Sequence, residues 1–349
     1  DQPPACVRVY PRRWAVLAAF CLLSFLNSWI WIAWSPLAYR AASLWNVTLS
    51  RVDDLSAAYM YVYVVLSFPC LRYLNRAGLR KGALVAGGLN CLGAAARYAW
   101  CGSYRGVYVG TFLCSCCQCF TLSMPPLISG TWFGEDERAT ATSIGVLSNN
   151  LGMGAGLGYS IFLTNSDNGD GDGAIGGDGD GDGDPFIEKY MLLQFGLSFI
   201  AWVIIPFCVT TDQPPSPPSL AAMTTNIPHP LDGETDEEST PLRRRNKNKG
   251  RGYAESLAIM FSSSSSVLFC LVYGTAVGVF YSVDTFLSQF LLPHGWSLRE
   301  IGTLGLSFIA AATVATAAAG YELDRSRRPR RAALVLLAAA VAAVAAFGA

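Results

Sequence analysis

Charged side chains are scarce in this chain. Asp, Glu, Lys and Arg together make up 14% of its 349 residues, whereas hydrophobic residues make up 52% and the mean hydropathy is +0.34. This composition excludes an ordinary soluble domain. The 25 basic residues balance the 25 acidic ones. Because no net positive field attracts nucleic acid, we expect no nucleic-acid partner.

The side chains that build enzyme and metal centres are also few. Only two histidines occur, His229 and His294, and neither belongs to a metal-ligand pattern. Four of the 11 cysteines fall in the apolar run 114–119, where a thiolate or a metal ion would be costly. We interpret them as small packing residues. No nucleophile–base arrangement is visible, so we predict neither an enzyme nor a metal or cofactor site.

Long apolar runs, in contrast, are abundant. A helix needs about 20 residues to cross a bilayer, and the stretches that approach this length are 14–38, 55–74, 82–100, 106–130, 139–164, 186–209, 267–291, 301–320 and 331–349. We predict an all-α, multi-pass membrane protein. The chain begins at Asp1 without a signal peptide, and its last apolar run reaches the final residue. We therefore expect a fragment that lacks residues at both ends.

The basic residues predict the orientation in the membrane. With the N-terminus inside, 19 of the 25 Lys and Arg residues fall on the inner side and 6 on the outer side. Such an excess marks the cytoplasmic face, so residues 1–13 are expected to be a cytoplasmic N-terminal segment. We expect the plasma membrane as the location. Asn46, in the sequon Asn-Val-Thr, then lies in the first outer loop as a glycosylation candidate.

Two short basic stretches occupy matching places in the chain. Residues 74–81 read LNRAGLRK and residues 323–328 read LDRSRR, and each lies between two apolar segments. A repeat of this length is typical of secondary transporters built from two related halves. The residues we expect to take part in conformational gating are Asn75, Arg76, Gly78, Arg80, Asp324 and Arg325.

Two inserts separate the apolar stretches. Residues 165–185 are rich in Gly and Asp and are expected to form an outer loop. The loop partly matches a calcium-binding pattern, but Lys189 stands at the twelfth position, so we interpret it as a low-complexity insert. Residues 210–255 have the composition of a disordered cytoplasmic linker, whose basic end can contact anionic lipid. The linker divides a six-helix bundle, 14–209, from a partial second bundle, 256–349.

The first apolar stretch carries one polar and aromatic face. Asn27, Trp31 and Ser35 follow each other at helical spacing. Trp31 lies at a depth comparable to that of Tyr281 in the first helix of the second half. Two such aromatic rings can form a cage for a quaternary ammonium group, worth about 2 kcal/mol when desolvated. The alternative is that the tryptophans of this stretch, Trp29 and Trp34 among them, are membrane-interface anchors.

Further polar residues lie inside other apolar stretches. Asn150 is either an interhelical hydrogen-bond partner or a donor to the substrate. It precedes two overlapping GxxxG pairs, Gly152/Gly156 and Gly154/Gly158, which let helix backbones approach each other. Asp284 either balances a cationic substrate, carries a proton, or lies in a wet outer vestibule without a role.

These residues resemble the feline leukaemia virus subgroup C receptor-related family of the major facilitator superfamily. The motifs that carry the resemblance are GLR at 78–80, GLNCLGA at 88–94, WFG at 132–134 and FYSV at 280–283. The sequence ERATA at 137–141 is similar to that of a closely related orphan branch. The resemblance implies a major facilitator fold of which nine of an expected twelve transmembrane helices are present.

The resemblance also implies facilitative transport of choline and ethanolamine, with haem as an older proposed substrate. The family's aromatic cage falls on Trp31 and Tyr281. Three positions depart from the family: Asn150 replaces a glutamine, Asn75 replaces an aspartate, and Asp284 stands where a small hydroxyl residue is expected. The leading hypothesis is a uniporter for a small organic cation. The alternatives are an exporter of haem or another amphiphile on the same fold, and a membrane receptor or scaffold without transport.

Overall fold

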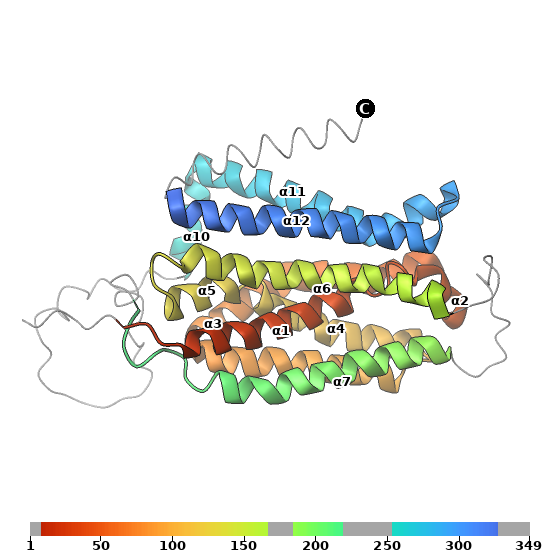
Figure 1. Ribbon diagram of the computed structural model, residues 1–349, viewed down its shortest axis with the longest axis horizontal. Coiled ribbons are helices and arrows are strands. Elements are labelled where there is room, and N and C mark those ends of the chain that lie inside the picture. The colour runs from red at the N-terminus through yellow and green to blue at the C-terminus, as the bar shows by residue number, and fades with distance from the viewer. Residues whose placement is uncertain (1–7, 167–183, 219–252, 327–349) are drawn as a thin grey trace, which may run out of the picture. The chain divides into compact units, whose positions relative to one another are not determined.

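The computed structural model describes residues 8–166, 184–218 and 253–326, and every regular element in them is a helix (Figure 1). The chain divides into two compact units. The first unit comprises Asp1–Ile227 together with Leu287–Ala349, and the second comprises Pro228–Phe286.

The first unit contains most of the helices. They are α1 (Arg12–Ile32), α2 (Ala38–Trp45), α3 (Leu49–Ala99), α4 (Tyr104–Thr121), α5 (Met124–Trp132), α6 (Arg138–Ser166), α7 (Pro185–Cys208) and α12 (Leu298–Ser326). The second unit contains α10 (Tyr253–Ser262) and most of α11 (Ser264–Leu291). The last residues of α11 belong to the first unit, and a short 3-10 helix, Leu292–His294, follows them.

Helix α3 contains two predicted stretches, 55–74 and 82–100, and the structure joins them directly. The backbone reverses at Gly78, whose φ of 85° and ψ of 171° are not helical. Cys119 and Cys114 on α4 donate to the carbonyls of Val62 and Asn90, at 3.9 and 3.6 Å. In one straight helix these two carbonyls would lie ~42 Å apart. The two halves of α3 therefore run side by side, and the loop expected between them is reduced to a kink.

The predicted stretch 106–130 falls within one candidate membrane crossing, Tyr104–Trp132, but it is not one unbroken helix. It is split into α4 and α5 at Leu122 and Ser123. Pro125 and Pro126 explain the break, because proline has no N–H for the helical ladder and its ring clashes with the preceding turn. The short α2 was also not predicted; its buried residues Ala38, Ala41 and Trp45 fall on one helical face.

Six helical stretches in the described part of the chain are long and apolar enough to cross a membrane. They include α1, α3, the α4–α5 pair, α7, α11 and α12. At 51 residues, α3 would measure ~77 Å if it were straight. That length exceeds the bilayer core of about 30 Å, so its two halves account for two crossings. The predicted ninth stretch, 331–349, lies outside the described residues, and the count of nine out of twelve stays a prediction.

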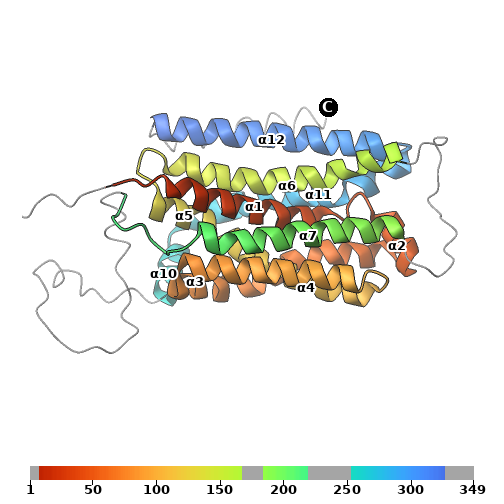
Figure 2. The same ribbon diagram turned by 60° about the horizontal axis from the view of Figure 1, so that its bottom comes forward.

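The glycines of α6 bring two neighbouring helices close. Figure 1 and Figure 2 both show α6 between α1 and α12. A Cβ atom at Gly152 would meet the Phe25 carbonyl oxygen and Ser28 Oγ of α1, and one at Gly156 would meet Ile32. On the other face, Gly158 approaches α12. One predicted GxxxG pair thus packs against α1 and the other against α12.

Candidate functional site

Trp31 is held firmly inside the first unit. Its side chain is only 1% exposed, and its indole N–H donates to the carbonyl of Ser56 on α3 at 3.1 Å. The ring of Tyr59 lies beside it, with ring centroids 6.2 Å apart and an interplanar angle of 44°. One α3 backbone carbonyl therefore fixes the orientation of the indole, and a second aromatic ring supports it.

Tyr59 was missed in the sequence because nothing distinguishes it from Tyr61 and Tyr63 in the same apolar run. Only burial separates them: Tyr59 is 0% exposed, whereas Tyr61 is 64% exposed. The alternating tyrosines in the sequence show where the aromatic rings are. Which of these rings faces inward depends on the helix that packs over it.

Tyr281 and Asp284 lie one helical turn apart on α11, in the second unit. The pairing of Trp31 with Tyr281 therefore stays a prediction. The end of α11 belongs to the first unit, where Ser288 donates to the carbonyl of Ser35 and the Gln289 amide donates to Asp53. These contacts attach the end of α11 to α3 and to the turn that follows α1.

Asn27 connects four helices. It is fully buried, and its Nδ2 donates both to Asn90 Oδ1 on α3 and to the Cys114 carbonyl on α4, each at 2.9 Å. Asn90 in turn donates to Ser198 Oγ on α7 at 3.2 Å. Buried amides with partners of this kind hold helices in register. The structure gives Asn27 an interhelical role, and its predicted role in substrate binding stays a prediction.

Asn150 is different. Its side chain is half-buried on α6, and it has no hydrogen-bond partner among the residues that the structure describes. The neighbouring Asn149 is buried, and its backbone carbonyl accepts a hydrogen bond from Ser28 Oγ of α1 at 2.8 Å. Both alternatives for Asn150, the interhelical contact and the donor to a substrate, stay predictions.

The predicted gating residues of the first basic stretch lie around the Gly78 kink. Asn75, Arg76 and Arg80 are exposed. The backbone N–H of Arg80 donates to Asp212 Oδ1 at 2.7 Å. The half of α3 that begins after Gly78 is expected to have unpaired backbone N–H groups in its first turn. Asp212 accepts a hydrogen bond from one of them, as a capping residue does. Asp212 is not among the residues predicted from the basic stretch, because it is 132 positions away from Arg80.

Gly78 is needed at this kink for two reasons. Its positive φ favours glycine, and a Cβ atom there would collide with the carboxylate of Asp212. In the second basic stretch, Arg325 is exposed and its Nη1 donates to the Tyr321 hydroxyl at 3.5 Å. Asp324 lies in α12, but its side chain is outside the described residues.

The segment after α7 also contacts the N-terminal residues. The Tyr10 hydroxyl lies 3.0 Å from Ser216 Oγ, and the Arg8 backbone N–H donates to the Pro217 carbonyl at 3.4 Å. Residues 210–218 of the predicted linker are thus ordered against the first unit. The remainder, residues 219–252, and the centre of the predicted outer loop lie outside the described residues.

Replacing Asp212 by alanine is expected to lower stability. The change removes the acceptor for the Arg80 N–H, and loss of a capping acceptor costs roughly 1 kcal/mol. The thermal unfolding midpoint of the purified protein should fall by a few degrees. Asp212→Asn keeps an acceptor oxygen and should restore most of the loss. Equal midpoints for Asp212→Ala and the parent would contradict the capping role.

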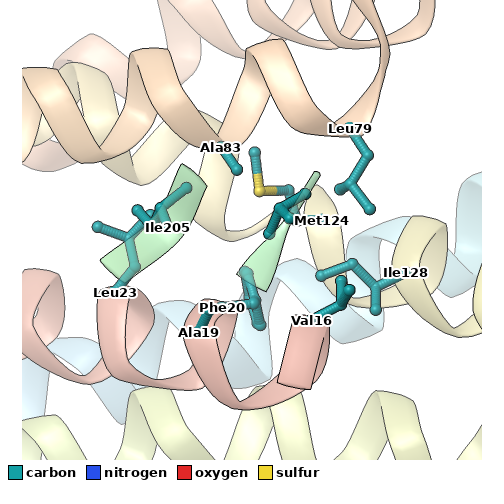
Figure 3. Close-up of a pocket in the computed structure, with 10 residues that line it drawn as sticks. Val16, Ala19, Phe20, Leu23, Leu79, Ala83, Met124, Ile128 and Ile205 are labelled. Carbon is teal, nitrogen blue, oxygen red and sulfur yellow. The ribbon is translucent and has the colours of Figure 1, made fainter. Parts of the chain in front are cut away.

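A small pocket between α1, α3, α5 and α7 is not a good candidate for a cation site. Figure 3 shows its side chains, which are apolar throughout. The lining residues are Val16, Ala19, Phe20, Leu23, Leu79, Ala83, Met124, Ile128, Ile205 and Val209. The lining has no polar or charged side chain, and it has no set of aromatic rings on several sides of the space. The pocket therefore has nothing to orient a charged ligand.

The family follows from comparison with known proteins. A model of the Major Facilitator Superfamily matches residues 14–349. The chain belongs to the Major Facilitator Superfamily. It is accordingly a multi-pass integral membrane protein, and the all-helical fold expected from the sequence is confirmed.

Relatives within the superfamily are named as transporters. The chain is 29% identical over 324 residues to "Choline/ethanolamine transporter flvcr2b" of Danio rerio, covering 92% of this chain and 61% of the relative. It is 29% identical over 345 residues to "Choline/ethanolamine transporter FLVCR1" of Mus musculus, covering 95% and 58%. "Solute carrier family 49 member A3" of Xenopus tropicalis is 25% identical, covering 92% and 60%. The resemblance proposed from the motifs is confirmed.

A solved structure supports the superfamily fold. The bacterial homologue of the human lysosomal transporter Spinster, in an inward-facing and unoccupied conformation, matches with a TM-score of 0.57 at 16% identity. The match covers 93% of this chain and 64% of that one. The chain spans about three fifths of the length of the curated relatives it matches.

Proposed function

We propose that this protein facilitates the transport of choline- or ethanolamine-type organic cations across a membrane. The observation that carries the proposal is the geometry of Trp31: its indole is buried, oriented by the Ser56 carbonyl and supported by Tyr59. A pre-oriented aromatic face attracts an ammonium group through its quadrupole without an added ordering cost. The similarity to choline/ethanolamine transporters supports the same substrate class.

In this proposal Trp31 and Tyr281 face the ammonium group from the two halves of the protein. Asn150 donates a hydrogen bond to the hydroxyl or amine end of the substrate. Asp284 adds a negative charge that favours a cation. The six-helix bundle 14–209 and the partial bundle 256–349 rock against each other around the site, and the residues around Gly78, Asp324 and Arg325 take part in that change.

The proposed location is the plasma membrane with the N-terminus in the cytoplasm. Epitope tags inserted after Gly171 and after Gly233 give a direct measurement. The first tag should be stained in intact cells, and the second only after permeabilisation, because 19 of 25 basic residues fall on the inner side. The reverse staining pattern would overturn the orientation.

Glycosylation at Asn46 provides an independent check on the same orientation. Asn46 is exposed in the turn after α2, and it adopts a left-handed conformation with φ of 49° that caps the helix. The sequon is therefore best removed by Thr48→Ala, which leaves the left-handed residue in place. With the first loop outside, glycosidase treatment should shift the parent protein on a gel, while Thr48→Ala should already run at the shifted position.

Two alternative functions predict results that differ from those of choline transport. One is haem export, and the other is a receptor or scaffold without transport. Haem is broad and anionic, so its transport would not follow the strength of a cation–π contact. A scaffold would leave cellular choline uptake unchanged on expression. Choline uptake by the parent and by Trp31 variants separates both from the proposed function.

A further inference from the structure

Arg97 is a charged residue buried inside the first unit. It lies two residues before the end of α3, and its side chain is only 1% exposed. The ion pairs in the described part of the chain are Arg13–Glu137 and Arg40–Asp184, so no described carboxylate neutralises Arg97. A buried charge costs several kcal/mol unless it is compensated. Arg97 therefore needs a counter-charge from another source.

The protein compensates this guanidinium only in part. Nη1 donates to the carbonyl of Ile30 in a long hydrogen bond of 3.4 Å, and the guanidinium lies over the ring of Trp34 at 5.0 Å. Nε and Nη2 are buried without an acceptor among the residues that the structure describes. Buried donors of this kind normally have a partner, whether protein, water or ion.

Two further buried donors lie in Trp34, whose ring Arg97 contacts, and in Thr111, next to Gly110. The indole N–H of Trp34 and the hydroxyl of Thr111 also have no hydrogen-bond partner among the described residues, whereas the Tyr59 hydroxyl lies within hydrogen-bond reach of Cys114. Thr111 follows Gly110 on α4, and a Cβ atom at Gly110 would lie 2.6 Å from Arg97 Cγ. Tyr59 is an electrostatic neighbour of Arg97. A cation on α3 therefore lies close to Trp34 in the turn after α1 and to the part of α4 that carries Thr111.

We propose that Arg97, Trp34 and Thr111 bind a small monovalent inorganic anion of the halide class, with chloride as the probe. Such an anion accepts hydrogen bonds from several directions, and it neutralises the guanidinium without adding a further donor. The exposed segment that follows α3, including Gly102 and Ser103, places the site near water at one end of the unit. The anion acts as a structural counter-charge. The proposal does not rest on choline transport.

Thermal unfolding of the purified full chain tests the proposal. At constant ionic strength, replacing gluconate by chloride should raise the unfolding midpoint with a saturating concentration dependence. At about a hundredfold above the dissociation constant, the rise should be roughly 5 °C or more. Bromide should act like chloride, whereas gluconate is too large for the site. Equal midpoints in chloride and gluconate would mean that water alone fills the site, and would overturn the proposal.

Variants connect the effect to Arg97. Arg97→Gln should lose the chloride-dependent shift, whereas Arg105→Gln, which removes an exposed charge near the same end of the bundle, should keep it. In case Arg97→Gln does not fold, Trp34→Phe and Thr111→Val keep the charge and remove one donor each. In each variant, the chloride concentration that gives half of the maximal midpoint shift should be severalfold higher than in the parent. A shift unchanged in these two variants would show that chloride acts elsewhere.

Discussion

Full-length protein carrying Trp31→Ala is expected to show at least tenfold weaker apparent affinity for choline than the parent. The indole contributes ~2 kcal/mol of cation–π attraction to a desolvated ammonium, and about 1.4 kcal/mol corresponds to a factor of ten. Trp31→Phe keeps a weaker aromatic face and should be milder. The measurement is uptake of radiolabelled choline in choline-deficient cells, corrected for surface expression.

Three comparisons make the Trp31 result specific. Tyr59→Phe keeps the ring beside the indole and should be close to the parent, whereas Tyr59→Leu removes that support and should weaken affinity. Trp296→Ala, at a tryptophan that is 43% exposed, controls for loss of any tryptophan. A neutral isostere of choline, with carbon in place of nitrogen, should compete poorly because it has no charge. Unchanged uptake by surface-expressed Trp31→Ala would reject the aromatic face as the cation site.

Most helices were predictable because a bilayer imposes a length. An apolar run of about 20 residues identifies a crossing without any knowledge of its neighbours, and α1, α7, α11 and α12 lie where such runs occur. The break between α4 and α5 depends on a backbone detail, the two adjacent prolines, inside a run that is apolar throughout. Hydropathy does not register such a break, although proline chemistry accounts for it afterwards.

The site was less predictable, because helical spacing gives the face of a residue but not the helix that covers it. Asn27 and Trp31 share a face of α1, as expected. Yet Asn27 donates to Asn90, 63 positions away, whereas the Trp31 indole donates to Ser56, 25 positions away. The hydrogen bond between Arg80 and Asp212 joins residues that are farther apart still in the sequence, at 132 positions. Such contacts depend on how the helices pack, and no local pattern encodes them.

Gly152→Ala is expected to destabilise the protein strongly. The added methyl group would meet the backbone carbonyl of Phe25 and the Ser28 hydroxyl, which itself donates to the Asn149 carbonyl. A backbone atom has little freedom to move aside, so α1 and α6 must separate. Overpacking of this kind costs about 1–3 kcal/mol and occasionally more. We expect an unfolding midpoint several degrees lower and reduced surface expression.

A series of glycine-to-alanine changes distinguishes backbone contact from helix propensity. At Gly158 the nearest atoms belong to the flexible end of Leu306, 2.9 Å away, so Gly158→Ala should be milder than Gly152→Ala. A Cβ atom at Gly196 on α7 would have no atom within 4 Å apart from the backbone of its own helix. Gly196→Ala should be neutral or slightly stabilising, because alanine favours the helix. Equal losses at all three positions would contradict close backbone packing of α6 on α1 as the reason for glycine at 152.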